Sequence, residues 1–289
     1  MANSISLVTK FLAILDEVYK KNSLTAALDA PTKPVEFGGA AAVNVLKLST
    51  VGLGTYSRST GYPAGDVTAA WETLILAASR GRALSVDRMD NEETLGMAFG
   101  RLADEWMRTK VAPEVDAYRF SKFASWSGIS SPSQAALADA AAVVAALRVA
   151  TNTMDEDEVP EEGRILYITP TLLGYVADQD TTKSKEVLAR FSQIVRVPQS
   201  RFYKGVTLDA GATADAGGYT KTASTGRDLN FLVVHPTAVL QAVKHDNMKY
   251  FDPETNQTAD AHLMQYRLYH DAFVYDNHVD GVYAHVKNS

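Results

Sequence analysis

The sequence predicts an α+β fold organised around one long central helix. Two observations predict it: an apolar stripe of helical period begins near Asp90, and segments of strand-like alternation lie on either side of it. A third observation is that proline and glycine residues separate most of these segments. With 289 residues, of which 46% are hydrophobic and 21% are charged, the chain is long enough for two modules with cores of their own.

The composition excludes several classes of function. The formal net charge of -6 is accompanied by no basic block, so a tight grip on nucleic-acid phosphates is not expected. Because the chain has no cysteine, it has no disulfide, thiolate nucleophile or cysteine-ligated metal. The apolar run 11–15 lies between Lys10 and Asp16, which makes it too short for a membrane span and wrongly flanked for a secretion signal.

The N-terminal region predicts a helix followed by an extended arm. Residues 5–19 place apolar side chains on one helical face. Residues 30–42 contain two prolines and the pair Gly38-Gly39 and show no periodicity, which favours an extended segment over part of a core. Such an arm requires a surface to lie on, either on its own chain or on a neighbouring one.

Residues 43–86 predict a two-stranded ribbon. Strand-like sequence leads out over 43–48 and back over 67–76, with several glycines and Pro63 between them. Because a two-stranded ribbon is barely stable alone in water, two interpretations stay open: a hairpin folded onto its own domain, or a projecting loop that packs on another subunit. Basic residues in and beside the ribbon either meet carboxylates of a neighbour or are solvated, and these are Arg58, Arg80, Arg82 and Arg88.

The central helix has a predicted beginning and end. Asp90 can cap it, and Glu93 can close a capping box three residues later. Asp104 and Arg108 can pair one turn apart on its polar face. Pro113 cannot continue a helix, so the helix is expected to end just before it. The apolar stripe of this helix consists of Leu95, Phe99, Leu102 and Trp106.

Beyond Pro113 the pattern changes. Residues 115–123 are predicted to be strand and loop. Ser131 and Pro132 then begin an alanine-rich helix, which is apolar nearly all round and is expected to be buried. The acidic run 155–162 is interpreted as a solvated turn rather than a metal site, because nothing in the sequence brings converging ligands together.

Residues 164–244 predict a compact α/β module. An apolar strand at 164–169 precedes a helix that begins at Pro170, and a strand at 230–234 precedes Pro236 in the same way, which predicts a helix over 238–244. The other elements expected in this module are a helix at 183–194, a strand at 195–197 and an exposed loop at 208–226.

The C-terminal stretch predicts a hairpin over residues 264–286. Strand-like alternation runs from Tyr266 to Val274, a turn follows at 276–281, and a returning strand occupies 282–286. A hairpin of this kind needs a partner layer, and the central helix is expected to supply it.

Signatures of catalysis or metal binding are missing from the sequence. It contains no nucleophile elbow, phosphate-binding loop or HExxH zinc helix, and Gly52 and Gly54 lack the third glycine of a dinucleotide-binding turn. Helix capping explains the carboxylates at 87–93, and core packing explains the aromatic residues of 106–126. Four of the six histidines lie near the C-terminus, at spacings that favour surface or interface positions over a metal site, and these are His262, His270, His278 and His285. The sequence therefore indicates no catalytic, cofactor-binding or metal-binding residue.

The order of these segments resembles the major capsid proteins of tailed double-stranded DNA bacteriophages, which have the HK97-like capsid fold. The resemblance covers nearly the whole chain and rests on many short pieces in the right order rather than on one motif. The pieces are VDRMDNEET, the long helix, VAPEVDAYRFSKFAS, VPEEGRILYITPTLLGYV, VPQSRFY, NFLVVHPTAVLQAVKH and YRLYHDAFVYDNHVDGVYAHV.

This resemblance implies a domain organisation. It implies an N-terminal arm at 1–44, an extended two-stranded loop at 45–86, a peripheral domain at 87–133 and 249–289 with a spine helix at 90–112, and an axial domain at 134–248. The arm and the ribbon, for which the residues alone indicate no surface, would then both be contacts between subunits.

The resemblance also implies a function. The chain would be a structural, non-enzymatic major capsid (head) protein that self-assembles as hexamers and pentamers into an icosahedral shell, enclosing double-stranded DNA without sequence-specific binding. It would use no cofactor and no membrane, and would act in the virion after assembly in the host cytoplasm. Its expected partners are copies of itself, portal and head-tail connector proteins, and a separate scaffolding or decoration protein.

Two other functions are kept beside this one. The first is an encapsulin-like bacterial nanocompartment shell of the same fold that encloses an enzyme. The second is an enzyme of another class, with an unrecognised site built on the carboxylates at 87–93.

Overall fold

The computed structural model describes most of the chain. The described residues are 23–29, 35–39, 42–93, 97–131, 134–179, 181–211 and 217–288. The helix predicted at 5–19 lies outside them, as does most of the arm predicted at 30–42. No helix among the described residues is long and apolar enough to cross a membrane.

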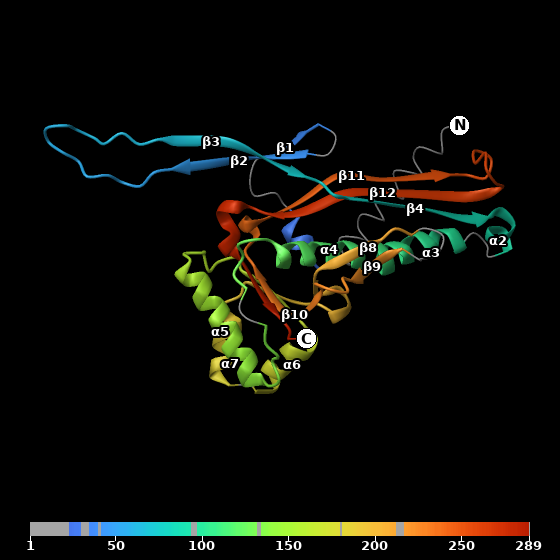
Figure 1. Ribbon diagram of the computed structural model, residues 1–289. Coiled ribbons are helices and arrows are strands. Elements are labelled where there is room, and N and C mark those ends of the chain that lie inside the picture. Colours follow the sequence, from blue (N-terminus) through green and yellow to red (C-terminus); the bar gives the residue numbers. More distant parts are fainter. Residues whose placement is uncertain are drawn as a thin grey trace.

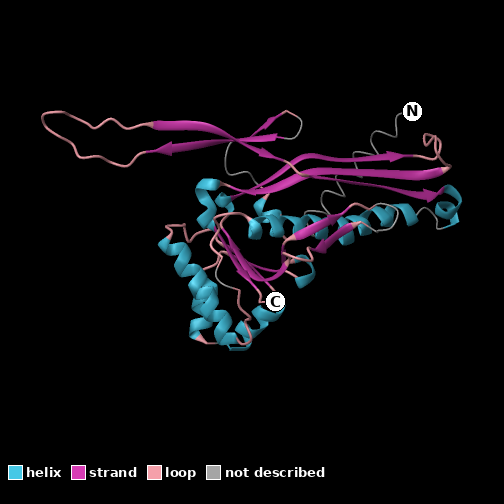
Figure 2. Cartoon of the chain, in the orientation of Figure 1, coloured by secondary structure: helices cyan, strands magenta, loops and turns pink. Residues whose placement is uncertain are grey.

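The molecule has three visible parts (Figure 1). A long, nearly straight helical segment runs beneath a three-stranded sheet, a second module of sheet and helices lies below one end of that segment, and a ribbon projects sideways from the sheet. Figure 2 shows that helices and strands are segregated into layers, as the predicted α+β class requires.

The central helical segment, which we call the spine, is longer than predicted. Its described parts are α2 (Arg88–Glu93) and, beyond residues 94–96, which lie outside the described residues, α3 (Met97–Trp106), a π-helical turn (Met107–Val111) and α4 (Ala112–Ser125). The prediction that it ends at Pro113 is wrong, and so is the strand predicted at 115–123. A proline clashes with the carbonyl four residues earlier in a regular α-helix. Here the amide of Ala112 bonds to the carbonyl of Met107, and this wider turn lets the helix continue through Pro113 at the start of α4.

The N-terminal cap of the spine also differs from the prediction. Asp90 lies inside α2, and Asp87 instead accepts a hydrogen bond of 2.9 Å from the amide of Met89. On the polar face, Arg108 pairs with Glu105 at 2.7 Å rather than with Asp104.

The three-stranded sheet has the order β11-β12-β4 and is antiparallel throughout. Its strands are β4 (Ala78–Asp87), β11 (Val239–Phe251) and β12 (Ala261–Val274). The predicted packing of the C-terminal strand on the central helix is confirmed. The buried cluster between the two layers consists of Ala103, Met107, Val111 and Val115 from the spine and Met248, Met264, Tyr266 and Leu268 from the sheet.

Two predictions for the C-terminal part are wrong. Pro236 begins only a 3-10 turn, Pro236–Ala238, after which the chain enters β11 rather than a helix over 238–244. The strand β12 and the final strand β13 (Val282–Val286) do not form a hairpin with each other. Instead β13 pairs with β10, because the 3-10 turn Asp276–Gly281 carries the chain from one sheet to the other.

The second module is a sheet with the order β13-β10-β5-β6, covered by helices. Its strands are β5 (Ile165–Ile168), β6 (Gln193–Arg196), β10 (Arg227–Val234) and β13, with β7 (Tyr203–Lys204) paired to one end of β10. Its helices are α5 (Ala140–Glu156), α6 (Pro170–Gln179) and α7 (Thr182–Ala189), and a 3-10 turn lies at Gln199–Arg201. The predicted strands at 164–169 and 230–234 and the helix from Pro170 are confirmed.

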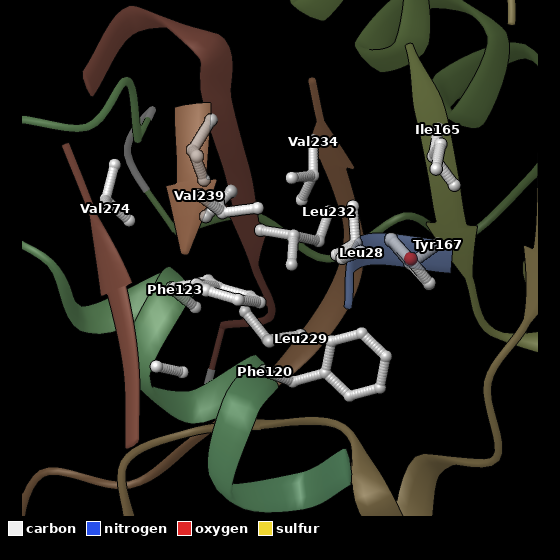
Figure 3. Packing of buried hydrophobic residues seen from close by; sticks show 14 of the residues in the cluster. Leu28, Phe120, Phe123, Ile165, Tyr167, Leu229, Leu232, Val234, Val239 and Val274 are labelled. Atoms are coloured by element: carbon white, nitrogen blue, oxygen red, sulfur yellow. The ribbon is translucent and has the colours of Figure 1, made fainter. Parts of the chain in front are cut away.

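The core of this module has two sides. One face of the sheet packs against α5, α6 and α7. The other face packs against α4, where Phe120 and Phe123 contact Leu229, Leu232 and neighbouring residues of β10 (Figure 3). The spine is therefore shared by the three-stranded sheet and the second module, which fixes the two relative to each other.

Several local predictions in this module need correction. Helix α5 begins at Ala140, where Asp139 accepts a hydrogen bond of 2.7 Å from Ala142, rather than at Pro132, and one face of it is solvated, with Val149 53% exposed. Helix α7 ends at Ala189 rather than at residue 194. The region 208–226 is not one loop, because β8 (Val206–Asp209) and β9 (Gly218–Lys221) pair within it.

The acidic run 155–162 is also more than a solvated turn. Asp155 forms ion pairs with the buried Arg164 at 2.8 Å and with Arg190 at 2.5 Å, and Arg190 also bonds Glu161 at 3.0 Å. Burial is the largest single influence on the pKa of Asp155 and raises it, but the hydrogen bonds and charges of Arg190 and Arg164 together outweigh burial and lower the pKa below its usual value. The run thus ties the end of α5 to the end of α7.

Candidate assembly surface

The ribbon is built from β1 (Val35–Gly38), β2 (Ala42–Thr50) and β3 (Val67–Ile75), in the order β1-β2-β3. Only its base is packed on the chain. There the buried residues Val43, Val45, Leu74 and Leu76 contact Leu240, Ala242, Phe273 and Tyr275. The rest of the ribbon extends beyond the body of the molecule (Figure 1). Of the two interpretations of this region, the projecting loop is the one that the structure has.

The register of β2 and β3 gives the ribbon one apolar face. Leu46 lies opposite Trp71, and Leu48 lies opposite Ala69. Because side chains alternate between the two faces of a strand and paired residues share a face, the alternate positions of both strands form one row. Asn44, Thr50 and Thr73 also lie in this row. We define its large apolar residues as the apolar stripe, which consists of Leu46, Leu48, Val67, Trp71 and Ile75.

The apolar stripe is exposed to solvent. Trp71 is 52% exposed, Leu48 56%, Ile75 69% and Val67 72%. The opposite face of the projecting part is polar and carries Lys47, Ser49, Thr68 and Glu72. On that face Lys47 reaches Asp276 of the body at 3.2 Å. The ribbon is thus amphipathic, and its apolar side lacks a cover among the described residues.

The tip of the ribbon, residues 51–66, adds further apolar surface. Leu53 is fully exposed and Tyr62 is 88% exposed. The tip is held in shape by the ring contact of Tyr56 and Tyr62, whose centroids are 5.0 Å apart. Large apolar side chains that are exposed together in this way mark a candidate site of interaction.

The four arginines singled out in the sequence have different surroundings. Arg80 pairs with Glu114 of its own chain at 2.5 Å. Arg82 reaches the carbonyl of Gly211 at 3.4 Å, and Arg88 lies 3.9 Å from Asp260. Arg58 is exposed at the tip of the ribbon.

The histidines do not form a metal site. No group of three or more histidine, aspartate or glutamate side chains in the described part of the chain is placed to hold a metal ion. The prediction of surface or interface positions is wrong for His270 and His285, which are only 2% and 5% exposed. Burial, helped by the charges of Arg119, Arg80 and Lys122, lowers the pKa of His270 to about 3. Burial alone lowers the pKa of His285. His262 instead bonds the hydroxyl of Tyr250 at 2.7 Å.

The remaining candidate residues are structural. Tyr118, Phe120 and Phe123 are buried in the core, as predicted, while Trp106 and Trp126 are partly buried. Among the carboxylates at 87–93, Asp87 caps the spine, and the side chains of Asp90, Glu92 and Glu93 lie outside the described part of the chain.

One polar cluster has no signal in the sequence. The carboxylate of Asp116, fully buried on α4, accepts hydrogen bonds from the segment 23–25, which is followed by the 3-10 turn Ala26–Leu28. An aspartate in the middle of a helix gives no indication that it will bind a segment so far away in the sequence.

Comparison with known proteins supports the architecture. No protein-family model and no curated protein sequence matches the chain. Solved structures do match over most of its length. The capsid of the cyanophage P-SCSP1u has a TM-score of 0.59 at 14% identity and covers 90% of each chain. The capsid of the Myoviridae phage XM1 has a TM-score of 0.57 at 10% identity and covers 92% of each. A virus-like particle from Pyrococcus furiosus has a TM-score of 0.57 at 10% identity and covers 96% of this chain and 98% of that one.

Proposed function

We propose that this chain, which has the HK97-like fold of tailed-phage capsid proteins, is the major capsid protein of such a phage and builds its shell from copies of itself. The observation that carries the proposal is the apolar stripe. It lies on a ribbon that projects away from the body, where no described part of its own chain covers it. A second copy supplies the missing surface.

The energetics favour many contacts of this kind over one. Burying a large apolar side chain completely contributes about 1.5–3 kcal/mol. Covering the side chains of the apolar stripe therefore stabilises each contact between subunits by several times this amount, minus the free-energy cost of ordering the two partners. A closed shell repeats the contact in every subunit, and repeated contacts of modest strength add up to an assembly that is hard to dismantle.

We assign the parts of the chain as follows. Residues 1–44 are an N-terminal arm, 45–86 an extended loop, 87–133 and 249–289 a peripheral domain, and 134–248 an axial domain. The last nine residues of the loop segment, 78–86, belong to β4, which pairs with β12 along its length. The ribbon is therefore rooted in the three-stranded sheet.

The role is structural rather than enzymatic. In hexamers and pentamers the subunits form an icosahedral shell around double-stranded DNA, in a virion assembled in the host cytoplasm. The net charge of -6 suits a container wall that does not adhere to its cargo. Portal and head-tail connector proteins complete the particle, together with any scaffolding or decoration protein.

A nanocompartment shell is the second candidate, and one observation favours it. The virus-like particle from Pyrococcus furiosus matches over 96% of this chain. Particles purified from cells that express this chain with the rest of its operon distinguish the two functions. Packaged double-stranded DNA supports the phage capsid, whereas a packaged enzyme without DNA supports the nanocompartment.

Electron microscopy of the purified protein tests assembly itself. We expect closed shells from the intact chain and a folded, unassembled subunit from a variant that lacks residues 52–65. Glu254→Gln, at an exposed position of the loop between β11 and β12, which lies at the opposite end of the molecule from the ribbon (Figure 1), is the control and should leave shells. A monodisperse monomer of the intact chain at high concentration contradicts the proposal.

A further inference from the structure

Arg80 joins three elements that are far apart in the sequence. It lies on β4, five residues beyond the end of β3. Its Nε atom donates to Glu114 of α4 at 2.5 Å, its Nη1 atom to the carbonyl of Asp209 at 2.8 Å, and its Nη2 atom to the carbonyl of Gly218 at 3.1 Å. Asp209 and Gly218 face each other at the outer end of the β8–β9 hairpin. One side chain thus fastens that hairpin to both the ribbon root and the spine.

The other contacts at the outer end of the β8–β9 hairpin are polar as well: the hydroxyl of Tyr219 donates to the carbonyl of Ser200 at 2.8 Å, and Arg82 donates to the carbonyl of Gly211 at 3.4 Å. No residue of its two strands is buried, and none belongs to the apolar clusters of the core. Its inner end is fixed by Ser121 of α4, whose hydroxyl accepts from the amides of Gly205 and Val206 at 3.1 and 3.0 Å. A segment held by polar contacts at its ends and by no buried apolar side chain belongs to the least stable parts of a fold.

A cavity beneath this hairpin gives it room to move. The cavity has a volume of about 690 Å³ and opens to solvent. Its walls are the hairpin, the spine near its π-helical turn, and the inner face of the sheet, with Trp106, Val111, Leu84, Tyr266 and Leu268 among the lining residues. Since close packing is the rule inside proteins, the hairpin spans a gap rather than a core.

We propose that Arg80 is a latch that holds the β8–β9 hairpin closed over this cavity and couples its position to that of the ribbon. Strand β4 is the direct continuation of β3, so a shift of the ribbon root displaces the guanidinium from the two carbonyls and frees the hairpin. The latch itself is a property of the single chain, whereas its release by ribbon docking rests on the proposed function.

The chemistry of the contact requires arginine. A guanidinium holds its donors in a rigid planar fork and can serve a carboxylate and two carbonyls at once. Lysine offers one ammonium group, which cannot span the same three acceptors in that geometry. The control is Ser79→Ala, because Ser79 is the exposed neighbour of Arg80 on the same strand and points to the opposite face of the sheet.

Hydrogen–deuterium exchange of the unassembled subunit tests the latch. In Arg80→Ala and Arg80→Lys we expect the amides of 206–209 and 218–221 to exchange at least about tenfold faster, because the hydrogen bonds that hold the outer end of the hairpin are lost. Exchange in β10 should stay unchanged, as should exchange throughout Ser79→Ala. Unchanged exchange of the hairpin in Arg80→Ala overturns the latch. Faster exchange that extends into β10 also overturns it, since Arg80 would then support the whole fold.

The same measurement on assembled shells tests the coupling. Docking of the ribbon should accelerate exchange of the hairpin in the wild-type chain, and should change it little in Arg80→Ala, where the hairpin is already free. Shells whose hairpins exchange as slowly as those of free subunits overturn the coupling while leaving the shell function intact. If no shells form, the proposed function fails, and exchange in the free subunit still decides the latch.

Discussion

The carboxylate of Asp116 accepts a hydrogen bond of 2.9 Å from the hydroxyl of Ser23, 93 positions earlier in the chain. The hydroxyl of Thr25 and the amide of Leu24 donate to the same carboxylate at 2.9 and 3.0 Å. Burial raises the pKa of Asp116 above the usual range for aspartate, although these hydrogen bonds and the charge of Arg119 oppose the shift. The cluster fixes the segment 23–29 to the spine, at the point where the N-terminal region enters the body.

Replacing Asp116 should therefore loosen this segment. In Asp116→Ala the buried donors of Ser23 and Thr25 lose their acceptor, and each unsatisfied group costs about 1–3 kcal/mol. We expect the free energy of unfolding to fall by about 3 kcal/mol or more, measured by urea denaturation, with faster proteolysis near residues 23–29. Glu105→Ala, which removes an exposed ion pair of the same spine, should cost at most about 1 kcal/mol. Equal losses in the two variants would contradict the anchoring role.

The sequence could not reveal this anchor. The central helix was predicted to end before Pro113, so Asp116 was not expected to lie on it. Pro113 is a helix-breaking signal, and a single π-helical turn is enough to pass it. Pro170 and Pro236 present the same local signal after a strand, yet only Pro170 begins a helix. After Pro236, pairing with β12 decides in favour of a strand, and that partner lies more than twenty residues away in the chain.

The ribbon was more accessible to sequence reasoning. Alternation in β2 and β3 and the glycines between them are local signals, and they predict both strands. The apolar stripe is not a local signal. It depends on Leu46 lying opposite Trp71, and no tight turn fixes that register across the tip of 51–66. Contacts at the base of the ribbon likewise decide whether it folds back or projects. Val43 and Leu74 are buried at that base, whereas Leu48, farther along the ribbon, is exposed.

Trp106 should contribute less to stability than its place on the apolar face of the central helix suggests. It is only partly buried, and it packs edge-to-face on Tyr266 with ring centroids 5.4 Å apart. We expect Trp106→Ala to lower the free energy of unfolding by about 2 kcal/mol, below the range of about 3–5 kcal/mol for a fully buried tryptophan. Met107→Ala, at a position that is 4% exposed, should cost about 2–5 kcal/mol. Chemical denaturation of both variants checks the order, and a larger loss for Trp106→Ala would show that the wrong side of the spine was assigned to the core.

His270 should make the fold sensitive to acid. Its pKa in the folded chain is about 3, below the ordinary value of 6.5, so the unfolded chain takes up a proton that the folded chain excludes. The part of the free energy of unfolding that comes from this difference in pKa is fully present above pH 6.5 and is lost as the pH falls towards 3. At pH 5 the loss amounts to about 2 kcal/mol relative to pH 7.

The variant His270→Phe isolates this effect. The ring Nδ1 of His270 has no hydrogen-bond partner, and the ring packs edge-on against Tyr118, so a phenyl ring can occupy the site. We expect the free energy of unfolding of His270→Phe to fall less than that of the wild type between pH 7 and pH 5. His278→Gln, at an exposed position, should keep the wild-type dependence. Identical pH profiles for His270→Phe and the wild type would contradict the assignment.

Trp71 and Thr68 allow the two faces of the ribbon to be compared. Both are exposed residues of β3, but Trp71 belongs to the apolar stripe and Thr68 lies on the polar face. A carboxylate at position 71 would have to be desolvated when the stripe is covered, whereas one at position 68 would stay in water. Thr68→Glu should change the free energy of unfolding by no more than about 0.5 kcal/mol. Trp71→Glu also removes the cross-strand pair with Leu46 and should cost at most about 1 kcal/mol.

Assembly should separate the two variants. Large aromatic side chains at the centre of an interface often contribute 2 kcal/mol or more, about thirtyfold in affinity. We therefore expect Trp71→Glu to raise the subunit concentration needed for shells by at least about tenfold, and Thr68→Glu to change it little, as measured by light scattering and electron microscopy. If the two variants assemble alike, the apolar stripe is not the surface that neighbouring subunits cover. If Trp71→Glu lowers the free energy of unfolding by more than about 1 kcal/mol, Trp71 stabilises the subunit itself, and its exposed face does not carry the contact.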